Sequence, residues 1–285
     1  FREDLIGNIF YREYLAPGAA ALYPIAPIRE GDQVNHTAVV MPKQGYIPQR
    51  FVEGDEVYVN TFDVTNAIDT NRSYIRDARW NVVANLTNAF RAGFIKKAND
   101  DGFHTILAAG LANGEMVSDA VAGAGVFTKL LIAKMQTRQH RRQLNGAITD
   151  LYVSPEAIED IRNWDIDDVD EITRREIFVN ENGVFRIYGT NIHKMRELGA
   201  DAQSEYQDYF VTTLGGALAG GGDTELVIGL DLQSRNLDSF VQPIREDMWV
   251  AEDETLRRFS KWGVFGGRTY GMAALSDGRV LLGSL

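Results

Sequence analysis

Apolar side chains recur at spacings of three and four residues between positions 73 and 99, the most regular pattern in the chain. The positions that share this spacing are Ile75, Val82, Val83, Leu86, Phe90 and Phe94. Such spacing places an apolar stripe on one face of a helix. The pattern therefore predicts a long amphipathic helix that Ser73 caps and that the polar run Asn99–Gly102 ends. A short helix containing Ile106 and Leu107 is expected to follow.

The middle of the chain predicts a loop, a helix, a strand and a further helix. The small, glycine-rich residues 111–125 predict the loop, and Val126–Leu144 predicts the helix. The apolar run Ala147–Val153 predicts a buried strand. Ser154-Pro155-Glu156 has the residue types of a helix start: a capping hydroxyl, a proline in the first turn and an acid near the positive helix end.

The rest of the chain is rich in strand patterns and glycine. Residues 165–224 are irregular and polar except for one predicted strand. The predicted strands are Val184–Tyr188, 225–233, 239–250 and Trp262–Leu275, then, after a tight turn at Asp277-Gly278, Val280–Leu282.

The N-terminal region lacks the pattern of a globular element. Pro17, Pro24 and Pro27 interrupt residues 1–35, and each proline favours extended backbone before it. An extended apolar strip cannot bury itself, so we interpret residues 1–35 as an arm that lies along another surface. A short helix around Arg2–Tyr14 is compatible with this interpretation.

Residues 36–65 predict a long hairpin. Thr37–Met41 and Phe51–Val64 are its two strands, and Pro42–Gly45 forms the turn. The two strands carry little apolar surface, and an isolated two-stranded hairpin is marginal in water. We therefore expect the hairpin to rest on a neighbour.

Composition narrows the classes of function. The 285-residue chain has no cysteine, which excludes disulfides, thiolate metal sites and a cysteine nucleophile. Its formal net charge of −11 argues against sequence-specific DNA binding, which usually needs a concentrated basic face. An acidic balance suits a container whose wall does not adsorb polyanionic contents, and it equally suits simple solubility.

No motif of an active or cofactor site is present. Walker A, GxGxxG and GxSxG patterns are missing, and His36, His104, His140 and His193 are scattered. We therefore expect no catalytic residue, no cofactor and no metal. The acidic run Asp165–Glu171, with Glu176 beyond it, suggests a calcium loop, but Val169 and Asp170 stand where a ligand and a glycine are needed, which favours a solvated acidic loop.

One basic cluster closes the second predicted helix. Its members are Lys134, Arg138, His140, Arg141 and Arg142. Positive side chains complement the negative end of a helix. We expect this cluster to form salt bridges with an acidic segment of another subunit, and a phosphate contact is the alternative.

The order of these elements resembles the major capsid proteins of tailed double-stranded-DNA bacteriophages. The resemblance covers essentially the whole chain and is carried most by Arg79–Gly102, Leu151–Ala157 and Gly266–Gly283. None of the three is a strict signature, so the resemblance rests on order and spacing. It implies an α+β subunit with an N-terminal arm, an extended loop hairpin, a peripheral domain with a spine helix and a β-sheet, and an axial domain.

The resemblance also implies boundaries for these parts. They are an arm at 1–35, an extended loop hairpin at 36–72, the peripheral spine helix at 73–110, an axial domain at 111–224, peripheral strands at 225–275, and a return to the axial domain at 276–285. The hairpin is expected to lie over the neighbouring subunit. The arm is expected to reach beneath other subunits, where symmetry supplies partners for its apolar surface.

The function that this resemblance implies is structural. The subunit is expected to assemble into hexamers and pentamers of an icosahedral head that is built in the host cytoplasm and encloses double-stranded DNA without sequence preference. Portal and scaffolding or protease proteins are the expected assembly partners, with a cement protein as a further one and no membrane. The alternatives are an encapsulin-type cellular compartment, which the arm disfavours, and a soluble α+β enzyme.

Some capsid proteins of this kind join a lysine of the extended loop to an asparagine of the next subunit, assisted by a glutamate. Lys43 could supply the amine, but 255–270 contains no asparagine and no acid. Ser260 falls near the amide position and Gly267 near the base. Asn236 or Glu254 could serve only along a different chain path. We therefore expect a shell without covalent crosslinks.

Overall fold

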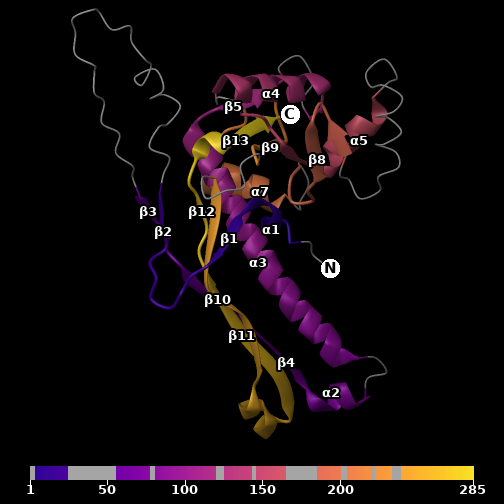
Figure 1. Ribbon diagram of the computed structural model, residues 1–285. Helices are drawn as coiled ribbons and strands as arrows, with labels where there is room; N and C mark the ends of the chain where they lie inside the picture. Colours follow the sequence, from indigo (N-terminus) through magenta and orange to yellow (C-terminus); the bar gives the residue numbers. More distant parts are fainter. Residues whose placement is uncertain are drawn as a thin grey trace, which may run out of the picture. The chain divides into compact units, whose positions relative to one another are not determined.

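The chain divides into two compact units, each built from segments that are distant in the sequence. In the computed structural model the described residues are 4–24, 56–77, 81–119, 125–142, 146–164, 185–199, 204–219, 222–232 and 239–285 (Figure 1). The first unit comprises residues 1–23, 57–105 and 235–275. The second comprises residues 24–56, 106–234 and 276–285.

A long antiparallel hairpin forms the centre of the first unit's sheet. Strand β10 (Phe240–Glu252) pairs with β11 (Lys261–Tyr270), and the 3₁₀ turn η3 (Glu254–Phe259) joins them. Strand β4 (Phe62–Asn71) pairs with the whole of β11, from Phe62 opposite Tyr270 to Asn71 opposite Lys261. The described strands complete this sheet with β1 (Tyr11–Tyr14) and β12 (Ala273–Ala274), both on β10.

A long helix covers one face of this sheet. Helix α2 (Arg72–Asp77) precedes α3 (Val82–Asn113), whose residues 106–113 belong to the second unit. The rings of Phe90 and Phe94 meet edge to face at 5.0 Å and pack with Val264 of β11. The predicted stripe is therefore confirmed as the face that buries aromatic side chains against the sheet.

The predicted end of that helix is wrong, because α3 continues through Asn99–Gly102. The Asn99 side chain accepts a hydrogen bond from the backbone N–H of Ile6 at 3.4 Å. The Asp101 carboxylate accepts one from the Tyr270 hydroxyl at 2.8 Å. Polar residues often favour the end of a helix. Here Asn99 and Asp101 make tertiary hydrogen bonds instead, and the helix continues beyond them.

The arm expected at residues 1–35 is wrong for residues 4–23, which belong to the first unit and contribute to its core. Helix α1 (Ile6–Ile9) buries Ile6 and Ile9, and the Phe10 ring packs on Phe240 at 5.4 Å. Strand β1 then runs parallel to β10, with Tyr11 opposite Val241. Pairing with β10 stabilises β1 as a strand. Because β10 lies more than two hundred residues away in the sequence, the local pattern around β1 does not predict this strand. The remaining residues, 25–35, lie outside the described part.

Most of the predicted hairpin at 36–65 also lies outside the described residues. Its first strand and its turn are therefore untested. The described part, from 56, forms β3 (Glu56–Tyr58), which pairs with β2 (Leu22–Pro24), and then β4. The second predicted strand is thus split in two, and its C-terminal part joins the large sheet.

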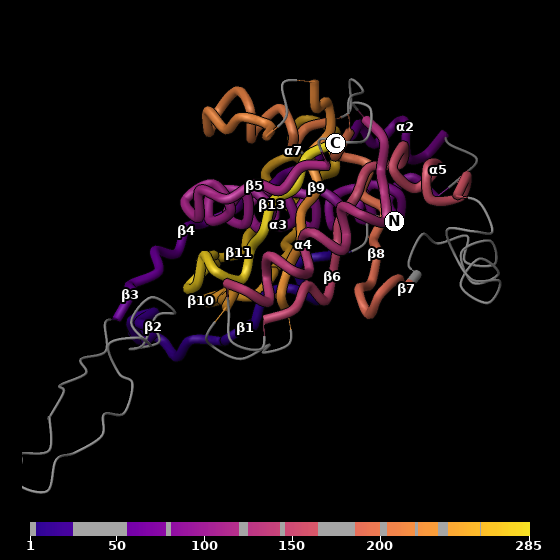
Figure 2. Tube along the Cα trace, turned by 90° about the horizontal axis from the view of Figure 1, so that it is seen from above, coloured from indigo at the N-terminus to yellow at the C-terminus, as the bar shows by residue number. Residues whose placement is uncertain are grey.

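The second unit contains a six-stranded sheet among the described residues. The strand order is β5 (Met116–Ser118), β13 (Val280–Ser284), β9 (Leu226–Leu230), β6 (Asp150–Val153), β8 (Thr190–Lys194) and β7 (Phe185–Ile187). Helices α4 (Lys129–Arg142) and α5 (Pro155–Asn163) share one apolar core with it. Strand β5 and helix α5 lie on opposite sides of this unit in both views (Figures 1 and 2).

Several predictions for this unit are confirmed and three need correction. Ser154 caps α5 as predicted, accepting from the backbone N–H of Ala157 at 3.0 Å. The strand expected at 225–233 forms, but as β9 it pairs with β13 and β6 instead of joining the hairpin strands. The loop expected at 111–125 contains the end of α3 and strand β5. The turn at Asp277-Gly278 is the short 3₁₀ helix η4 (Asp277–Arg279).

In its described residues, the irregular region holds a helical element that the sequence did not predict. A single α-helical turn, α7 (Glu205–Asp208), continues directly into the π-helical segment η2 (Tyr209–Thr213). Tyr206 and Phe210 are its buried anchors. Within the described residues no helix is long and apolar enough to cross a membrane.

Candidate functional site: polar network and exposed surfaces

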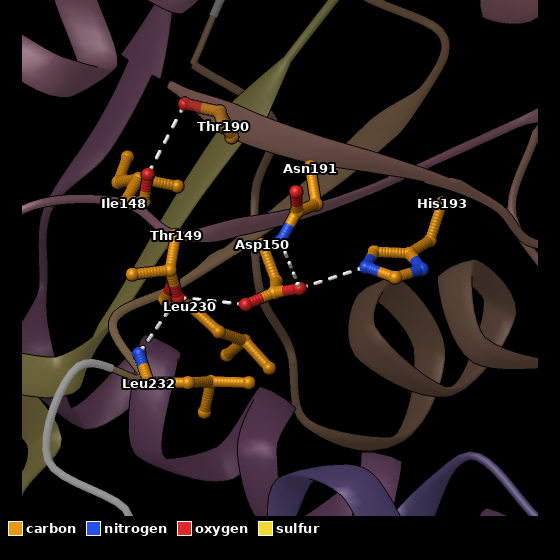
Figure 3. A network of polar contacts seen from close by, with 8 residues as sticks. All are labelled: Ile148, Thr149, Asp150, Thr190, Asn191, His193, Leu230 and Leu232. Atoms are coloured by element: carbon orange, nitrogen blue, oxygen red, sulfur yellow. Dashed lines mark hydrogen bonds and ion pairs between the residues drawn. The ribbon is translucent and has the colours of Figure 1, made fainter. Parts of the chain in front are cut away.

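A polar network surrounds Asp150 at the start of β6 (Figure 3). One carboxylate oxygen contacts the Nε2 of His193 at 2.8 Å and accepts from the Asn191 amide at 3.3 Å. The other accepts from the Thr149 hydroxyl at 2.7 Å, and that hydroxyl accepts from the backbone N–H of Leu232 at 2.9 Å. The network therefore ties β6 to β8 and to the end of β9.

Neighbouring side chains stabilise the ionised form of Asp150. Burial alone raises the pKa of its carboxyl, but the hydrogen bonds from His193, Thr149 and Asn191 outweigh burial and lower the pKa. The His193 ring also stacks on Tyr152 at 4.8 Å. In a nucleophilic triad the hydroxyl donates to the imidazole. Here the hydroxyl of Thr149 donates to the carboxylate, so the arrangement suits a structural clamp.

A second carboxylate, Glu225, is buried beside the start of α5. The Ser154 hydroxyl donates to it while also capping the helix. Burial raises the pKa of Glu225, and the nearby carboxylates of Glu156 and Asp160 raise it further, although the hydrogen bond from Ser154 lowers it. The start of α5 is therefore a region of negative potential.

The basic cluster of α4 lies beside β5 along a shallow groove of about 620 Å³. Lys134 pairs with Asp119 at 2.9 Å, and the Arg138 guanidinium binds both carboxylate oxygens of Glu115 at 2.8 and 2.9 Å. For these two residues the expected salt bridge to another subunit is wrong, because the acids belong to the same chain. Arg141 also lines the groove, and its side chain is exposed.

The first unit exposes an aromatic pair on its sheet. Trp249 and Phe265 meet edge to face at 5.6 Å and remain 38% and 39% exposed. Residues alternate between the faces of a strand. Phe265 follows Val264, which packs on Phe90, so its side chain lies on the face opposite α3. The sequence signal for this surface is the alternation within 261–270, which our sequence reading did not use.

The three histidines in the described part of the chain lie at separate places in the fold. His193 belongs to the Asp150 network, His140 is exposed on α4, and His104 is half-buried on α3. His36 and the acidic run Asp165–Glu171 lie outside the described residues, so the calcium hypothesis stays untested. Elsewhere in the described segments, no group of three or more histidines and acids is placed to hold a metal ion.

Of the residues considered for a crosslink, three are described. Ser260 is exposed between η3 and β11, Gly267 lies on β11 opposite Thr65, and Glu254 is exposed at the start of η3. The remaining two, Lys43 and Asn236, lie outside the described residues.

Comparison with solved structures identifies the fold. No protein-family model and no curated protein matches the sequence. The capsid of the cyanophage P-SCSP1u matches with a TM-score of 0.61 at 9% identity, over 98% of this chain and 87% of that one. The mature capsid of bacteriophage PhiM1 matches with 0.62 at 9%, over 100% and 88%.

A third structure, the capsid of an empty GTA particle, matches with a TM-score of 0.62 at 10% identity, over 100% of this chain and 91% of that one. These matches span both units at nearly full length in both chains. Sequence identity is too low to carry residue roles across. The chain therefore has the fold of the phage major capsid proteins.

Proposed function

We propose that this chain is the structural subunit of an icosahedral phage-type head, assembling into hexamers and pentamers around double-stranded DNA. The observation that carries the proposal is the likeness of fold to phage capsids over essentially the whole chain. A match over only part of the chain could come from a single domain shared with an otherwise different protein. A match that includes both units supports a shared architecture.

In this proposal the first unit is the peripheral domain and the second is the axial domain. The first unit holds α3 and the long hairpin, which are the spine helix and β-sheet that the resemblance implies. The extended loop that the resemblance implies is proposed to lie over the neighbouring subunit. The exposed pair Trp249 and Phe265 supports the need for a neighbour, since a large apolar side chain gains about 1.5–3 kcal/mol from full burial.

The DNA in this proposal is held without sequence preference. The net charge of −11 disfavours strong adsorption of a polyanion to the wall. Contacts are made to phosphates and weaken as salt rises. The partners are portal and scaffolding or protease proteins during assembly in the host cytoplasm, with a cement protein as a further one.

Electron microscopy of the purified protein tests the proposal. We expect closed shells, and we expect particles from infected or producing cells to contain nuclease-protected DNA. Shells that carry a cargo enzyme and no DNA would indicate an encapsulin-type compartment. A protein that stays monomeric or dimeric across salt, pH and concentration would contradict the shell function and leave an enzyme to be sought.

A further inference from the structure

Charge is segregated within the second unit. Helix α4, residues 129–142, carries five lysines and arginines and no acid. Helix α5, residues 155–163, carries three acids and a single arginine. In a chain with 40 acids and 29 lysines and arginines, α4 is a strong local exception.

The basic element lies at one edge of the sheet. Helix α4 runs beside β5, the outermost described strand on that side, and the groove between them is lined by Leu130 and Thr137 as well as by the basic side chains. Leu130 is 44% exposed, so the groove includes apolar surface. Internal acids neutralise Lys134 and Arg138, whereas no ion pair joins Arg141 to an acid within the described segments.

The acidic helix α5 lies on the side of the unit opposite β5, as both views show (Figures 1 and 2). The start of α4 reaches α5, where the backbone N–H of Phe127 donates to Asp160 at 2.8 Å. Helix α5 buries Ala157, Ile158 and Ile161 and turns Glu156 and Glu159 to solvent. Among the described residues no ion pair is formed by either exposed acid. Glu225 lies buried near them and accepts a hydrogen bond from Ser154 at the start of α5.

We propose that the α4–β5 groove of one copy of this chain receives the acidic α5 surface of the next copy, with Arg141 facing Glu159. Two different, complementary surfaces on opposite sides of one unit make a head-to-tail contact, and a rotation repeated around an axis closes such contacts into a ring. The inference rests on the proposed function, and it names the contact that holds neighbours within a ring.

Charge complementarity suits this role. Opposite potentials on two surfaces select the correct partner and orientation more than they add affinity. Like surfaces, α4 against α4 or α5 against α5, repel each other. The arrangement therefore favours the head-to-tail contact over a two-fold pairing of either surface.

A charge swap tests the inference. Arg141→Glu and Glu159→Arg are each expected to raise the protein concentration needed for assembly by about tenfold or more, which corresponds to about 1.4 kcal/mol per contact. The double variant Arg141→Glu/Glu159→Arg is expected to restore assembly. Both side chains are exposed, so all three variants are expected to melt at the wild-type temperature.

Arg91→Glu serves as the control for net charge, because Arg91 is exposed on α3 in the other unit. It is expected to assemble like the wild type. If Arg91→Glu fails as badly as Arg141→Glu, the loss reports net charge and the proposal is overturned.

Four other results would also overturn it. The single variants could assemble like the wild type, or both could fail without rescue in the double variant. A melting temperature that falls in each single variant and recovers in the double would place the pair within one chain. Normal shells of Arg141→Glu that retain less DNA would assign α4 to phosphate contacts. A wild type that never assembles is a separate outcome, which contradicts the proposed function and this contact with it.

Discussion

Gly102 on α3 lies directly against Ile6 of α1: a methyl group on Gly102 would stand 2.1 Å from the Cδ1 of Ile6. Both residues are buried, and Ile6 has no exposed surface. The N-terminal helix therefore packs onto the long helix at a point where the missing side chain leaves room for it. This contact explains a glycine that the local pattern marks as a helix end.

Gly102→Ala is expected to destabilise the first unit, whereas Gly93→Ala is expected to stabilise it slightly. Alanine gains about 1 kcal/mol over glycine inside a helix. At Gly102 overpacking against Ile6 costs about 1–3 kcal/mol and outweighs that gain. At Gly93, which is exposed, the nearest atom is the end of the Asn66 side chain at 3.0 Å. Thermal melts of the two variants are the measurement. Equal shifts in melting temperature for Gly102→Ala and Gly93→Ala would contradict the close contact between Gly102 and Ile6.

Removal of residues 1–24 is expected to unfold the first unit or to lower its melting temperature strongly. The deletion removes β1 from the sheet and takes Ile6 and Phe10 from the core. Burial of each such side chain is worth about 1.5–3 kcal/mol, and a domain's total stability is only about 5–15 kcal/mol. A truncated protein with unchanged melting would restore the interpretation of this segment as an arm.

Phe90→Ala is expected to cost about 3–5 kcal/mol of stability. The Phe90 side chain is 0% exposed and packs with Phe94 and Val264. Phe259→Ala removes the same atoms at a position that is 72% exposed, so its effect on unfolding is expected to stay within about 0.5 kcal/mol. Denaturant unfolding of both variants is the measurement. Similar midpoints would show that the stripe on α3 is not a core face.

Asp150 and Glu225 are expected to give opposite pH dependences. The pKa of Asp150 is lowered in the folded state, so its contribution is present above the unfolded pKa and is lost as pH falls through the folded value. Asp150→Asn is therefore expected to lose about 1–3 kcal/mol at neutral pH, with a smaller loss in acid.

The pKa of Glu225 is raised in the folded state, so its ionisation lowers stability once pH exceeds the unfolded pKa, up to the folded value. Glu225→Gln is expected to melt higher than the wild type at neutral pH, and the difference is expected to vanish in acid. Melting temperatures between about pH 3 and pH 8 span the ordinary range of carboxyl titration. Parallel pH curves for wild type and both variants would contradict both shifts.

The shell is expected to contain no covalent crosslinks. The chemistry needs an amine, an amide and a carboxylate together. Residues 255–270 provide no asparagine and no acid, and Ser260 and Gly267 stand where these groups are expected. Mature particles boiled in detergent should give one band near the mass of a single subunit on a denaturing gel. A ladder of dimers and larger oligomers would overturn the prediction.

The sequence by itself determined the elements whose signals are local. The stripe containing Phe90 and Phe94 predicted a helix and its buried face, because both follow from the helical repeat alone. Ser154 with Pro155 predicted the start of α5, because a cap needs only neighbouring residues. The order of such elements was enough to suggest the capsid fold, which the solved structures support.

Only the tertiary structure decided where distant segments meet. The sequence marks Asn99–Gly102 as a helix end, and contacts with Ile6 and Tyr270 turn these residues into part of α3. The prolines mark residues 1–35 as an arm, and pairing with β10 makes residues 11–14 a strand. Nothing local links Asp150 to His193. The physical reason is the same in each case: the stabilising partner lies far along the chain, and its contribution exceeds the small preferences of the local backbone.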